Sequence, residues 1–516
     1  MSGRAGERDE FAAKSRPAAR VPVARILPSD CLTPVMVFRR LRAAGAEPFL
    51  LESVEGGESI ARYTFLGADP SARLSVRDGQ TLLERSGIIR PCEGSPLAAL
   101  DRLVRGAEFV SDPELPPLAG GAVGYLSYDA VRLFEAIPDR HAREGSVPDA
   151  LFLIFDAVAA FDHPRQRLLL LSTVDRYAEA DALKAAEAAI ARLDRLEALI
   201  RGGEEAGTSP ASTRPLHVGA ALAAARFSPA MPKPQFLAAV AEAQEAIAAG
   251  EIYQVVVSQR WTAPLDLDPF DVYRALRALN PSPYLFYLET REATVFGSSP
   301  EMLVRCRGRE VETRPIAGTA PRGGDPAEDA ALAERLRADP KERAEHVMLV
   351  DLARNDLGRV CEIGSVRVGR YADVEKFSHV QHLVSEVRGT LDAGRTAVDA
   401  VAACFPAGTL TGAPKIRAME LIDRLETQRR GPYGGAVGYF DNAGNCDLAI
   451  AIRTAVVEDG VCRVQAGAGI VADSVPEKEY AEAESKAKAL FDAIELARQW
   501  FPSENPKSKI QNPKSK

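Results

Sequence analysis

Residues 313–324, with the sequence TRPIAGTAPRGG, constrain the backbone more tightly than an ordinary stretch of this length. Two prolines and three glycines fall within these twelve residues. Proline fixes φ and lacks a backbone donor, and glycine loses much conformational freedom on ordering, so the stretch cannot be an ordinary helix or a central strand. We predict a rigid loop that exposes its backbone, carries the charges of Arg314 and Arg322, and has Ala317 at its middle.

The chain around this loop divides into five parts by composition. Strand-like apolar runs and a long helical pattern occupy the first part, and helical and strand-like patterns alternate through the second. A stretch rich in Gly, Ser, Thr and Pro separates them. The predicted fold class is α+β. The predicted parts are a flexible arm at 1–21, an N-terminal part at 22–200, a linker at 201–224, a larger part at 225–499 and a disordered tail at 500–516.

The composition excludes several classes of function. The formal net charge is −8, whereas a general nucleic-acid binder is normally basic. No apolar run reaches the ~18 residues of a membrane-spanning helix, and the N-terminal segment lacks the apolar core of a secretion signal. The seven cysteines are scattered without a CxxC pair, as expected of reduced thiols. We therefore expect a cytoplasmic protein that binds neither nucleic acid nor a membrane.

Two predicted helices each carry a pair of glutamates. The first contains Glu342 and Glu345, and the second, nearer the C-terminus, contains Glu479 and Glu482. Residues three apart share a helix face, so two such helices meeting across a cleft would offer four carboxylates, which suit Mg²⁺. Most pairs with this spacing are simply solvated helix faces, so the spacing alone leaves both interpretations open.

Glycine-rich turns cluster in the second half of the chain. The segments PIAGTAPRGG, PAGTLTGAPK, GPYGGAVGY and QAGAGIV each let backbone N–H groups approach an anion closely. None fits GxxxxGK[ST] or GxGxxG, so nucleotide binding is disfavoured. Glycine also serves ordinary turns and strand bulges. Four such turns together with Arg453 nevertheless indicate a small anionic ligand.

These motifs appear in an order that resembles the chorismate-utilising enzymes and, among them, the component I subunits of anthranilate synthase. The resemblance is dense over 235–495 and extends to FLLESVEGGESIARYTFLG at 49–67. It implies a two-layered α/β fold with large antiparallel sheets, in which 22–200 is regulatory and 225–499 binds chorismate. It rests on the segments IYQVVVSQR, NPSPYLFYLE, GSSPEML, RPIAGTAPRG, ERAEHVMLVDLARNDLGRV, HLVSEVRG, GTLTGAPKIRAME, YGGAVGYF and QAGAGIVADSVPEKEYAEAESKAKAL.

The resemblance implies a lyase reaction. Ammonia attacks C2 of the chorismate ring while the C4 hydroxyl leaves, and a second step expels pyruvate, which leaves anthranilate for tryptophan biosynthesis. Hydroxide is a poor leaving group, so a general acid is required. Glu301 matches the family's acid, and burial should raise its pKa. His382 matches a histidine implicated in the family's catalysis.

Mg²⁺ is the cofactor that the resemblance implies. Glu345 and Glu482 would bind it directly, Glu342 and Glu479 would assist through water, and the metal would hold the ring carboxylate of chorismate. Lys486 lies one helical turn after Glu482 and could also reach this anion. The positions assigned to substrate binding are Gly318, Thr319, Tyr433, Arg453, Gly467, Ala468, Gly469 and Lys486.

Two positions select the nucleophile. In the related aminodeoxychorismate synthases, a lysine stands where this chain has Ala317, and that lysine attacks the ring. Isochorismate and salicylate synthases carry a lysine in place of Gln254 to activate water. Alanine cannot be a nucleophile and glutamine is a poor base, so we expect direct attack by ammonia. The chain departs from the usual GTRPRG pattern at Ala320, which leaves Arg322 to anchor the loop.

The N-terminal part resembles a tryptophan feedback site. Its LLES motif ends in Glu52 and Ser53, and the later NPSPY segment supplies the other wall with Pro283, Tyr284 and Leu285. A site built from both parts could convert tryptophan binding into a domain shift. The alternative is that LLES is a buried strand end. No GxCxG motif precedes a suitable His–Glu pair, so a separate glutamine amidotransferase subunit is expected to supply ammonia.

Two other functions stay open at this point. One is component I of aminodeoxychorismate synthase, in the folate pathway, in a form without the nucleophilic lysine. The other is a non-catalytic regulatory protein that binds chorismate or tryptophan. The presence of the acid and of all four carboxylates disfavours the second.

Overall fold

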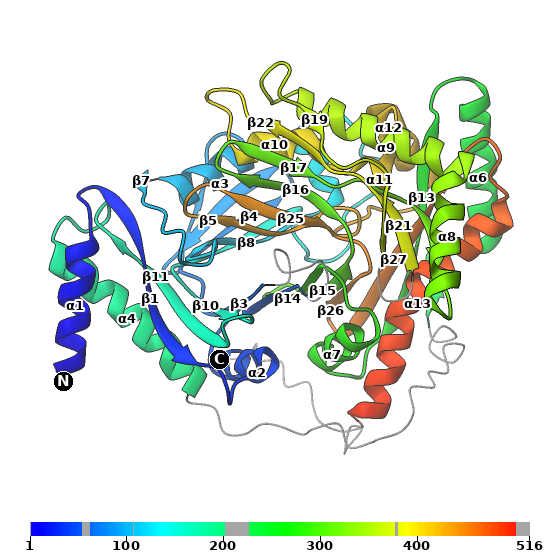
Figure 1. The fold of residues 1–516 in the computed structure, drawn as a ribbon. Coiled ribbons are helices and arrows are strands. Elements are labelled where there is room, and N and C mark those ends of the chain that lie inside the picture. The colour runs from blue at the N-terminus through cyan, green and yellow to red at the C-terminus, as the bar shows by residue number, and fades with distance from the viewer. Residues whose placement is uncertain (1, 54–61, 107, 202–226, 377–379, 502–516) are drawn as a thin grey trace.

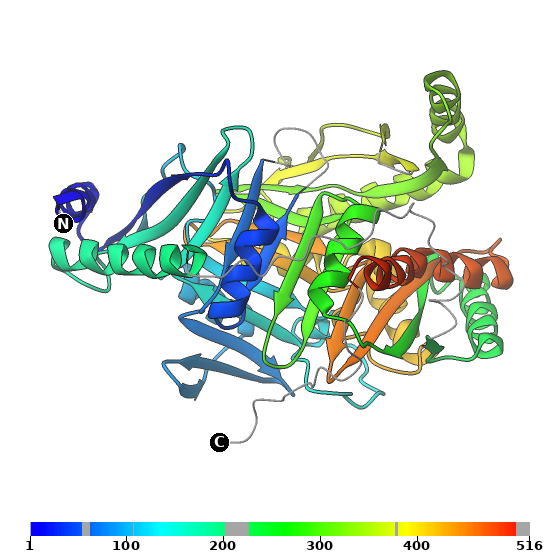
Figure 2. The ribbon, with the colours of Figure 1, turned by 90° about the horizontal axis from the view of Figure 1, so that it is seen from below.

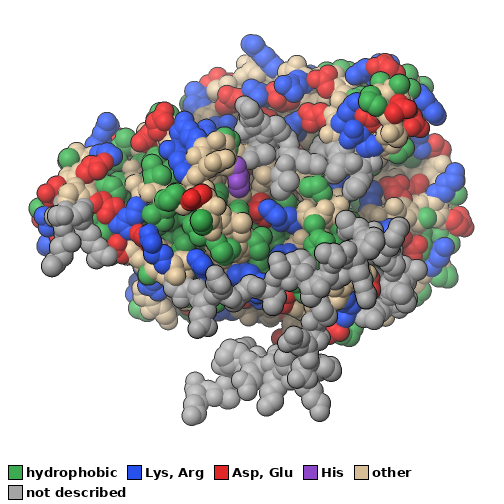
Figure 3. Space-filling view, turned by 60° about the horizontal axis from the view of Figure 1, so that its bottom comes forward, with side chains coloured by type: hydrophobic (Ala, Val, Ile, Leu, Met, Phe, Trp, Pro, Cys, Tyr) green, Lys and Arg blue, Asp and Glu red, His purple; other side chains and the backbone are tan. Residues whose placement is uncertain are grey.

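The structure is a computed structural model, shown in Figure 1, that describes residues 2–53, 62–106, 108–201, 227–376 and 380–501. Most of the predicted linker and tail therefore lies outside the described residues. No helix in the described ranges is long and apolar enough to cross a membrane. On the face seen in Figure 3, the coloured Lys and Arg side chains are interspersed with Asp and Glu.

The larger of two central sheets has 13 strands. Their order is β12-β13-β27-β26-β15-β14-β2-β3-β10-β11-β1-β7, with β23 added on β13. The strands pair antiparallel, except that β1 and β7 are parallel. The strands are β1 (Ala19–Pro28), β2 (Phe49–Glu52), β3 (Tyr63–Gly67), β7 (Glu108–Phe109), β10 (Ala157–Asp162), β11 (Arg167–Asp175), β12 (Ser228–Pro229), β13 (Gln254–Pro264), β14 (Tyr284–Glu289), β15 (Thr294–Ser299), β23 (Gly412–Ala413), β26 (Thr454–Glu458) and β27 (Val461–Ile470).

The second sheet has 11 strands in the order β19-β22-β17-β16-β25-β24-β8-β9-β4-β5-β6. A third sheet has three strands in the order β18-β21-β20. The second sheet contains β4 (Ala72–Arg77), β5 (Gln80–Arg85), β6 (Ile88–Pro91), β8 (Gly121–Leu126), β9 (Ala150–Phe155), β16 (Met302–Arg307), β17 (Glu310–Thr313), β19 (Arg367–Val368), β22 (Val387–Thr390), β24 (Ala436–Asp441) and β25 (Cys446–Ile450). The third contains β18 (Ile316–Pro321), β20 (Asp373–Lys376) and β21 (Val380–Val384).

Both large sheets combine strands from the two predicted parts of the chain. Strand β2 pairs with β14, and β8 pairs with β24, so each sheet continues across the predicted boundary at 201–224. The α+β class with large antiparallel sheets is confirmed. The N-terminal and C-terminal parts share their sheets, because the pairing partners of β2 and β8 lie far away in the sequence.

Helices cover the outer faces of the sheets. Helices α4, α2, α7 and α13 follow one another across the larger sheet, in teal, blue, green and red in Figure 2. An apolar core fills the space between the two sheets, where the rings of Phe49 and Phe155 lie 4.7 Å apart. The helices are α1 (Ser2–Lys14), α2 (Pro34–Ala44), α3 (Pro96–Arg105), α4 (Ala182–Arg201), α6 (Lys233–Ala248), α7 (Pro269–Leu279), α8 (Pro326–Ala338), α9 (Pro340–Gly358), α10 (Ala397–Cys404), α11 (Gly408–Thr411), α12 (Lys415–Leu425) and α13 (Pro476–Trp500), with a short 3₁₀ helix at Tyr128–Leu133.

The N-terminal segment differs from the loose arm that we expected over 1–21. Helix α1 occupies most of it and packs on α4, with Phe11 only 3% exposed. Arg25 joins the two helices, since its guanidinium lies 2.7 Å from Glu7 and 3.0 Å from Asp194. The polar helix α1 is therefore held in place by the buried side chain of Phe11 and by the ion pair of Glu7 with Arg25.

The glycine- and proline-rich stretch at 313–324 is an edge strand over part of its length. β18 lies at the edge of the three-stranded sheet, and its register shifts between Ala317 and Thr319 around Gly318. The prediction of a loop was wrong over Ile316–Pro321, because these residues pair with β21, whereas the exclusion of a helix and of a central strand is confirmed. Arg322 anchors its far end by a 2.9 Å ion pair with Asp329.

Candidate functional site

Glu301 lies in the turn that leads from β15 in the larger sheet to β16 in the second sheet. Its side chain is buried, and the hydroxyl of Thr409 donates a 3.0 Å hydrogen bond to Oε1. Burial raises the pKa of Glu301 to about 8, while Thr409, Lys486 and Arg453 act in the opposite direction. The carboxyl is therefore mostly protonated at neutral pH, so it can donate a proton.

The four predicted metal ligands come from helices α9 and α13. Burial raises the pKa of Glu345, and the negative charge of Glu482 raises it further. Burial likewise raises the pKa of Glu342, and the negative charge of Glu345 raises it further. The same holds for Glu479, whose pKa is raised by burial and by the charge of Glu482. These carboxylates therefore repel one another across and along the two helices. A divalent cation would relieve that repulsion, so the donor set fits Mg²⁺.

The carboxylates do not form a finished ligand cage. Within the described ranges, no three side chains of His, Cys, Asp or Glu are grouped closely enough to hold a metal ion. Lys486 supplies positive charge instead. Its Nζ lies 2.7 Å from Glu482 and donates a 3.0 Å hydrogen bond to the carbonyl of Gly467. Both partners of this ion pair are about half exposed, so their side chains have room to rearrange.

The edge strand β18 contacts the acidic helix α9 and the predicted catalytic histidine. Thr319 lies opposite His382 of β21, and the backbone N–H of Thr319 donates a hydrogen bond to Glu342. Nδ1 of His382 donates a 2.8 Å hydrogen bond to the carbonyl of Gly318. Burial lowers the pKa of His382, although the bond to Gly318 opposes it, so the imidazole is neutral at pH 7.

Gly318 is held in a conformation and a space that suit glycine alone. Its φ is +67°, and an added Cβ would lie 2.9 Å from Glu342 Oε2 and 3.2 Å from Leu336 Cδ1. We expect Gly318→Ala to lower the free energy of unfolding by about 2–3 kcal/mol, through backbone strain and crowding together. Gly364→Ala is the matched control in chemical denaturation, because Gly364 has φ +80° with open space around it. Equal losses in the two variants would show that crowding against α9 contributes nothing.

The glycines of β27 make room for a polar side chain of β13. An added Cβ at Gly469 would collide with the side-chain amide of Gln254. That amide donates a hydrogen bond to Glu345, and its Oε1 is buried without a hydrogen-bond partner in the described part of the chain. Ala468 is fully buried in the core. Gln254 thus presents an acceptor beside the acidic helices.

Arg453 and Tyr433 lie in different surroundings. Arg453 sits between β25 and β26, close enough to Glu301 and His382 for its charge to lower the pKa of each. Tyr433 is buried, 5.7 Å from the Arg430 guanidinium, and lines a separate cavity. The structure thus gathers Arg453 with the predicted catalytic groups and places Tyr433 in a neighbouring wall.

All the residues predicted to bind tryptophan line one cavity of about 670 Å³. Pairing of β2 with β14 brings Glu52 opposite Leu285, which joins the two walls. Ser53 Oγ is buried and has no hydrogen-bond partner among the described atoms. The carboxylate of Glu52 accepts bonds from Tyr273 (2.6 Å) and Arg277 (2.9 Å). The five predicted residues are Glu52, Ser53, Pro283, Tyr284 and Leu285.

Thr409, the hydrogen-bond donor to Glu301, was missed by the sequence analysis. It belongs to the GTLTGAPK segment, which carried a visible signal in its glycines. That signal indicated a turn near an anion and could not indicate which hydroxyl would face the acid. The contact depends on how α11 packs against the turn between β15 and β16.

Comparisons with known proteins identify the family of this chain. The sequence profile of the family described as chorismate binding enzyme matches residues 46–492. The chain is 46% identical over 502 residues to anthranilate synthase component 1 of Mycobacterium tuberculosis (95% of this chain, 96% of the relative) and 44% identical over 482 residues to that of Thermus thermophilus (92% and 98%).

Solved structures show the same fold. Anthranilate synthase component I from Streptococcus pneumoniae TIGR4 superposes with a TM-score of 0.73 at 36% identity, covering 90% of this chain and 99% of that one. The menaquinone-specific isochorismate synthase of Escherichia coli gives 0.67 at 21% identity, covering 96% and 100%, which supports the fold alone. The chain therefore belongs to the chorismate binding enzymes and, within them, to the family of anthranilate synthase component 1.

Proposed function

We propose that this chain converts chorismate and ammonia into anthranilate and pyruvate, as a Mg²⁺-dependent lyase at the first step of tryptophan biosynthesis. The observation that supports this most is the buried, protonated carboxyl of Glu301, which lies within electrostatic reach of the cations Lys486 and Arg453. An acid for the leaving hydroxyl thus lies beside positive charges for the carboxylates of chorismate.

In the proposed reaction, Glu301 donates its proton as the bond between C4 and the hydroxyl breaks, so the group leaves as water. The ammonia nitrogen forms its bond at C2 and then loses a proton. Glu301 is left as a buried carboxylate whose burial makes it a good base. Uptake of the C2 proton by Glu301, while the C–O bond to the enolpyruvyl group breaks, would return Glu301 to its starting state and leave an aromatic ring. The released enolpyruvate would take up a proton from solvent to become pyruvate.

The residues around the reacting carbon favour ammonia over other nucleophiles. Ala317 is buried in β18 and has no group that could attack the ring. Gln254 contacts Glu345 but is too weak a base to activate water. Its unpartnered Oε1 is an acceptor that could receive an N–H of the incoming ammonia.

The proposed Mg²⁺ would be held by Glu345 and Glu482, with Glu342 and Glu479 assisting through water. When bound, it would supply positive charge to hold and polarise the ring carboxylate of chorismate. Lys486, which now neutralises Glu482, would then be available to the substrate. This exchange of partners explains why the helix pair has a lysine among its acids.

The ammonia source that we propose is a separate glutamine amidotransferase subunit. The relatives are named as component 1, which implies a second component. We place the enzyme in the cytoplasm, where seven free cysteines remain reduced.

Product analysis tests the proposed reaction. The purified chain is incubated with chorismate, Mg²⁺ and ammonium, and the products are separated and detected by fluorescence. Anthranilate together with pyruvate is the expected result. Aminodeoxychorismate would support the folate-pathway alternative, and no turnover would support a binding protein.

The cavity formed by β2 and β14 is the proposed site for feedback inhibition by tryptophan. Tyr63, Phe65 and Tyr284 give it aromatic walls that suit an indole ring. Ala449 of β25 also lines it, and the next residue, Ile450, donates a 3.0 Å backbone hydrogen bond to the carbonyl of Glu301. One strand thus joins this cavity to the proposed acid.

We expect Ser53→Ala to raise the tryptophan concentration for half-inhibition by about tenfold while leaving uninhibited turnover unchanged. The buried hydroxyl has no partner in the described structure, and its bond to a charged amino acid group is worth ~1.5–3 kcal/mol. Initial rates are measured over a tryptophan series. Ser71→Ala is the control, since Ser71 Oγ bonds to Ile154 outside this cavity. Unchanged inhibition in Ser53→Ala would remove Ser53 from the site.

A further inference from the structure

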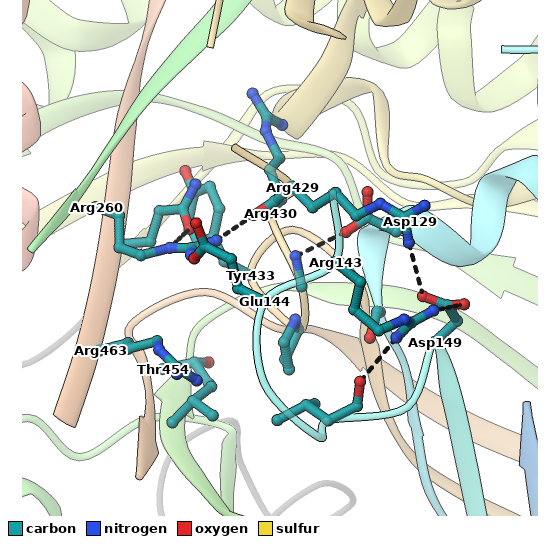
Figure 4. Close-up of a pocket in the computed structure, with 16 residues that line it drawn as sticks. Asp129, Arg143, Glu144, Asp149, Arg260, Arg429, Arg430, Tyr433, Thr454 and Arg463 are labelled. Atoms are coloured by element: carbon teal, nitrogen blue, oxygen red, sulfur yellow. Dashed lines mark hydrogen bonds and ion pairs between the residues drawn. The ribbon is translucent and has the colours of Figure 1, made fainter. Parts of the chain in front are cut away.

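A second polar cavity, of about 660 Å³, lies between the loop 143–149, the strands β13 and β27, and the segment 429–433 (Figure 4). Five arginines and three acids line it. Three more carboxylates, Asp139, Glu426 and Glu458, pair with these arginines from outside the lining, so an anion could bind only where an arginine's own partner can leave. The charged residues are Arg143, Arg260, Arg429, Arg430 and Arg463 with Asp129, Glu144 and Asp149.

Four of the five arginines have settled carboxylate partners. Two of these carboxylates, Glu426 and Glu458, are buried. Breaking their ion pairs with arginine would leave a buried charge without a partner, which costs much folding free energy. The pairs are Arg143 with Asp149, Arg429 with Asp139, Arg430 with Glu426 and Arg463 with Glu458.

Arg260 is neutralised less completely. Its guanidinium donates to two uncharged acceptors, Gln465 Oε1 at 3.1 Å and the carbonyl of Arg429. The carboxylate that it contacts is Glu144, 3.2 Å away; the side chain of Arg260 is 8% exposed, and that of Glu144 is 55% exposed. Burial lowers the pKa of Arg260, and the charge of Arg463 lowers it further, whereas Glu144, Asp129 and Glu426 act in the opposite direction. Among the described residues, Glu144 is the carboxylate that forms an ion pair with this buried cation.

The loop that carries Glu144 is anchored on both sides of it. Arg143 donates a 2.9 Å hydrogen bond to the carbonyl of Val147, and Ser146 Oγ donates a 2.6 Å bond to Glu458. Figure 4 shows Glu144 reaching toward Arg260 from this loop. The half-exposed side chain of Glu144 can therefore swing into solvent without a change in the backbone, whereas the buried guanidinium of Arg260 would then need another anion as its partner.

We propose that this cavity binds a small oxyanion, a phosphate or a carboxylate, which replaces Glu144 against Arg260. Glu144 then acts as an internal competitor that fills the site when the anion is scarce. Tyr433, which the resemblance assigns to chorismate binding, forms part of the wall and lies 5.7 Å from the Arg430 guanidinium. A bound anion would therefore lie close to a residue of the proposed substrate site. Neither Glu301 nor His382 lines this cavity, so anion binding there does not depend on the proposed reaction.

Calorimetric titration of inorganic phosphate, and separately of acetate, into the full chain tests this proposal, with ionic strength held constant by chloride. Glu144→Gln keeps the size of the side chain and removes the competing charge, so phosphate or acetate should bind about two- to fivefold more tightly than to wild type, the worth of a partly exposed ion pair. Tighter phosphate binding would indicate a phosphate ligand, and tighter acetate binding a carboxylate ligand. Glu334→Gln is the matched control, because Glu334 pairs with Arg337 on α8 and does not line the cavity.

Arg260→Gln is expected to lose most of the affinity for either anion, with folding checked by circular dichroism. Should that variant fail to fold, the comparison of Glu144→Gln with wild type decides the matter alone. Equal affinities in Glu144→Gln and wild type, or no measurable binding of either anion to either protein, would overturn the proposal.

Discussion

Glu301→Gln is expected to lower kcat for anthranilate formation by about 10²–10⁴-fold, the usual contribution of a general acid. The amide keeps the size of the side chain and can still accept the bond from Thr409, but it has no acidic proton to give. The measurement is a steady-state rate with ammonium as the nitrogen source. Turnover within threefold of wild type would remove Glu301 from the acid role.

The pH dependence of the same variant separates catalysis from stability. The folded-state pKa of Glu301 is raised from the usual 4.5 to about 8, so wild-type kcat should fall as pH rises through 8, where the acid loses its proton. Burying a carboxylate also costs folding free energy, which grows as pH rises from about 4.5 through 8. Glu301→Gln should therefore be more thermostable than wild type above pH 8 while being nearly inactive.

Glu345→Gln should raise the Mg²⁺ concentration for half-maximal activity by about 10- to 100-fold. The substitution removes one charge from a set of carboxylates whose mutual repulsion a cation relieves. Mg²⁺ titration of the activity, together with direct calorimetric titration, measures the change. Partial recovery of kcat at high Mg²⁺ is expected, because the other three carboxylates remain.

Glu484→Gln is the matched control for this prediction, since Glu484 is an exposed residue of α13 two positions after Glu482. It should respond to Mg²⁺ as the wild type does. An unchanged Mg²⁺ response in Glu345→Gln would mean that α9 and α13 do not hold the metal, and that the ion pair of Lys486 with Glu482 is their permanent arrangement.

Local features were the ones that the sequence predicted well. The predicted helix that carries Glu342 and Glu345 is confirmed as α9, which begins at Pro340 with the Asp339 carboxylate accepting bonds from its first turn. The exclusion of a helix and of a central strand at 313–324 follows from the missing donors of its prolines and the free φ angles of its glycines, whereas its pairing with β21 was not predicted. Both predictions needed only the chemistry of a few adjacent residues.

Contacts between distant segments could not be derived in this way. Helix α1 looked like a polar arm because Arg25 and α4, which hold it, are remote in the sequence. The interleaving of both chain halves in two sheets depends on registers that the whole fold selects. The pairing of Lys486 with Glu482, one turn apart on α13, is a local contact, whereas the hydrogen bond from Lys486 to the carbonyl of Gly467 depends on how α13 packs against β27.

Incubation of the purified chain with chorismate, Mg²⁺ and ¹⁵N-ammonium, followed by mass spectrometry, tests the central claim most directly. The account predicts ¹⁵N-labelled anthranilate and pyruvate in equal amounts, with no covalent adduct on the protein, because Ala317 offers no nucleophile. Isochorismate, labelled aminodeoxychorismate without pyruvate, or a substrate adduct on the chain would contradict it.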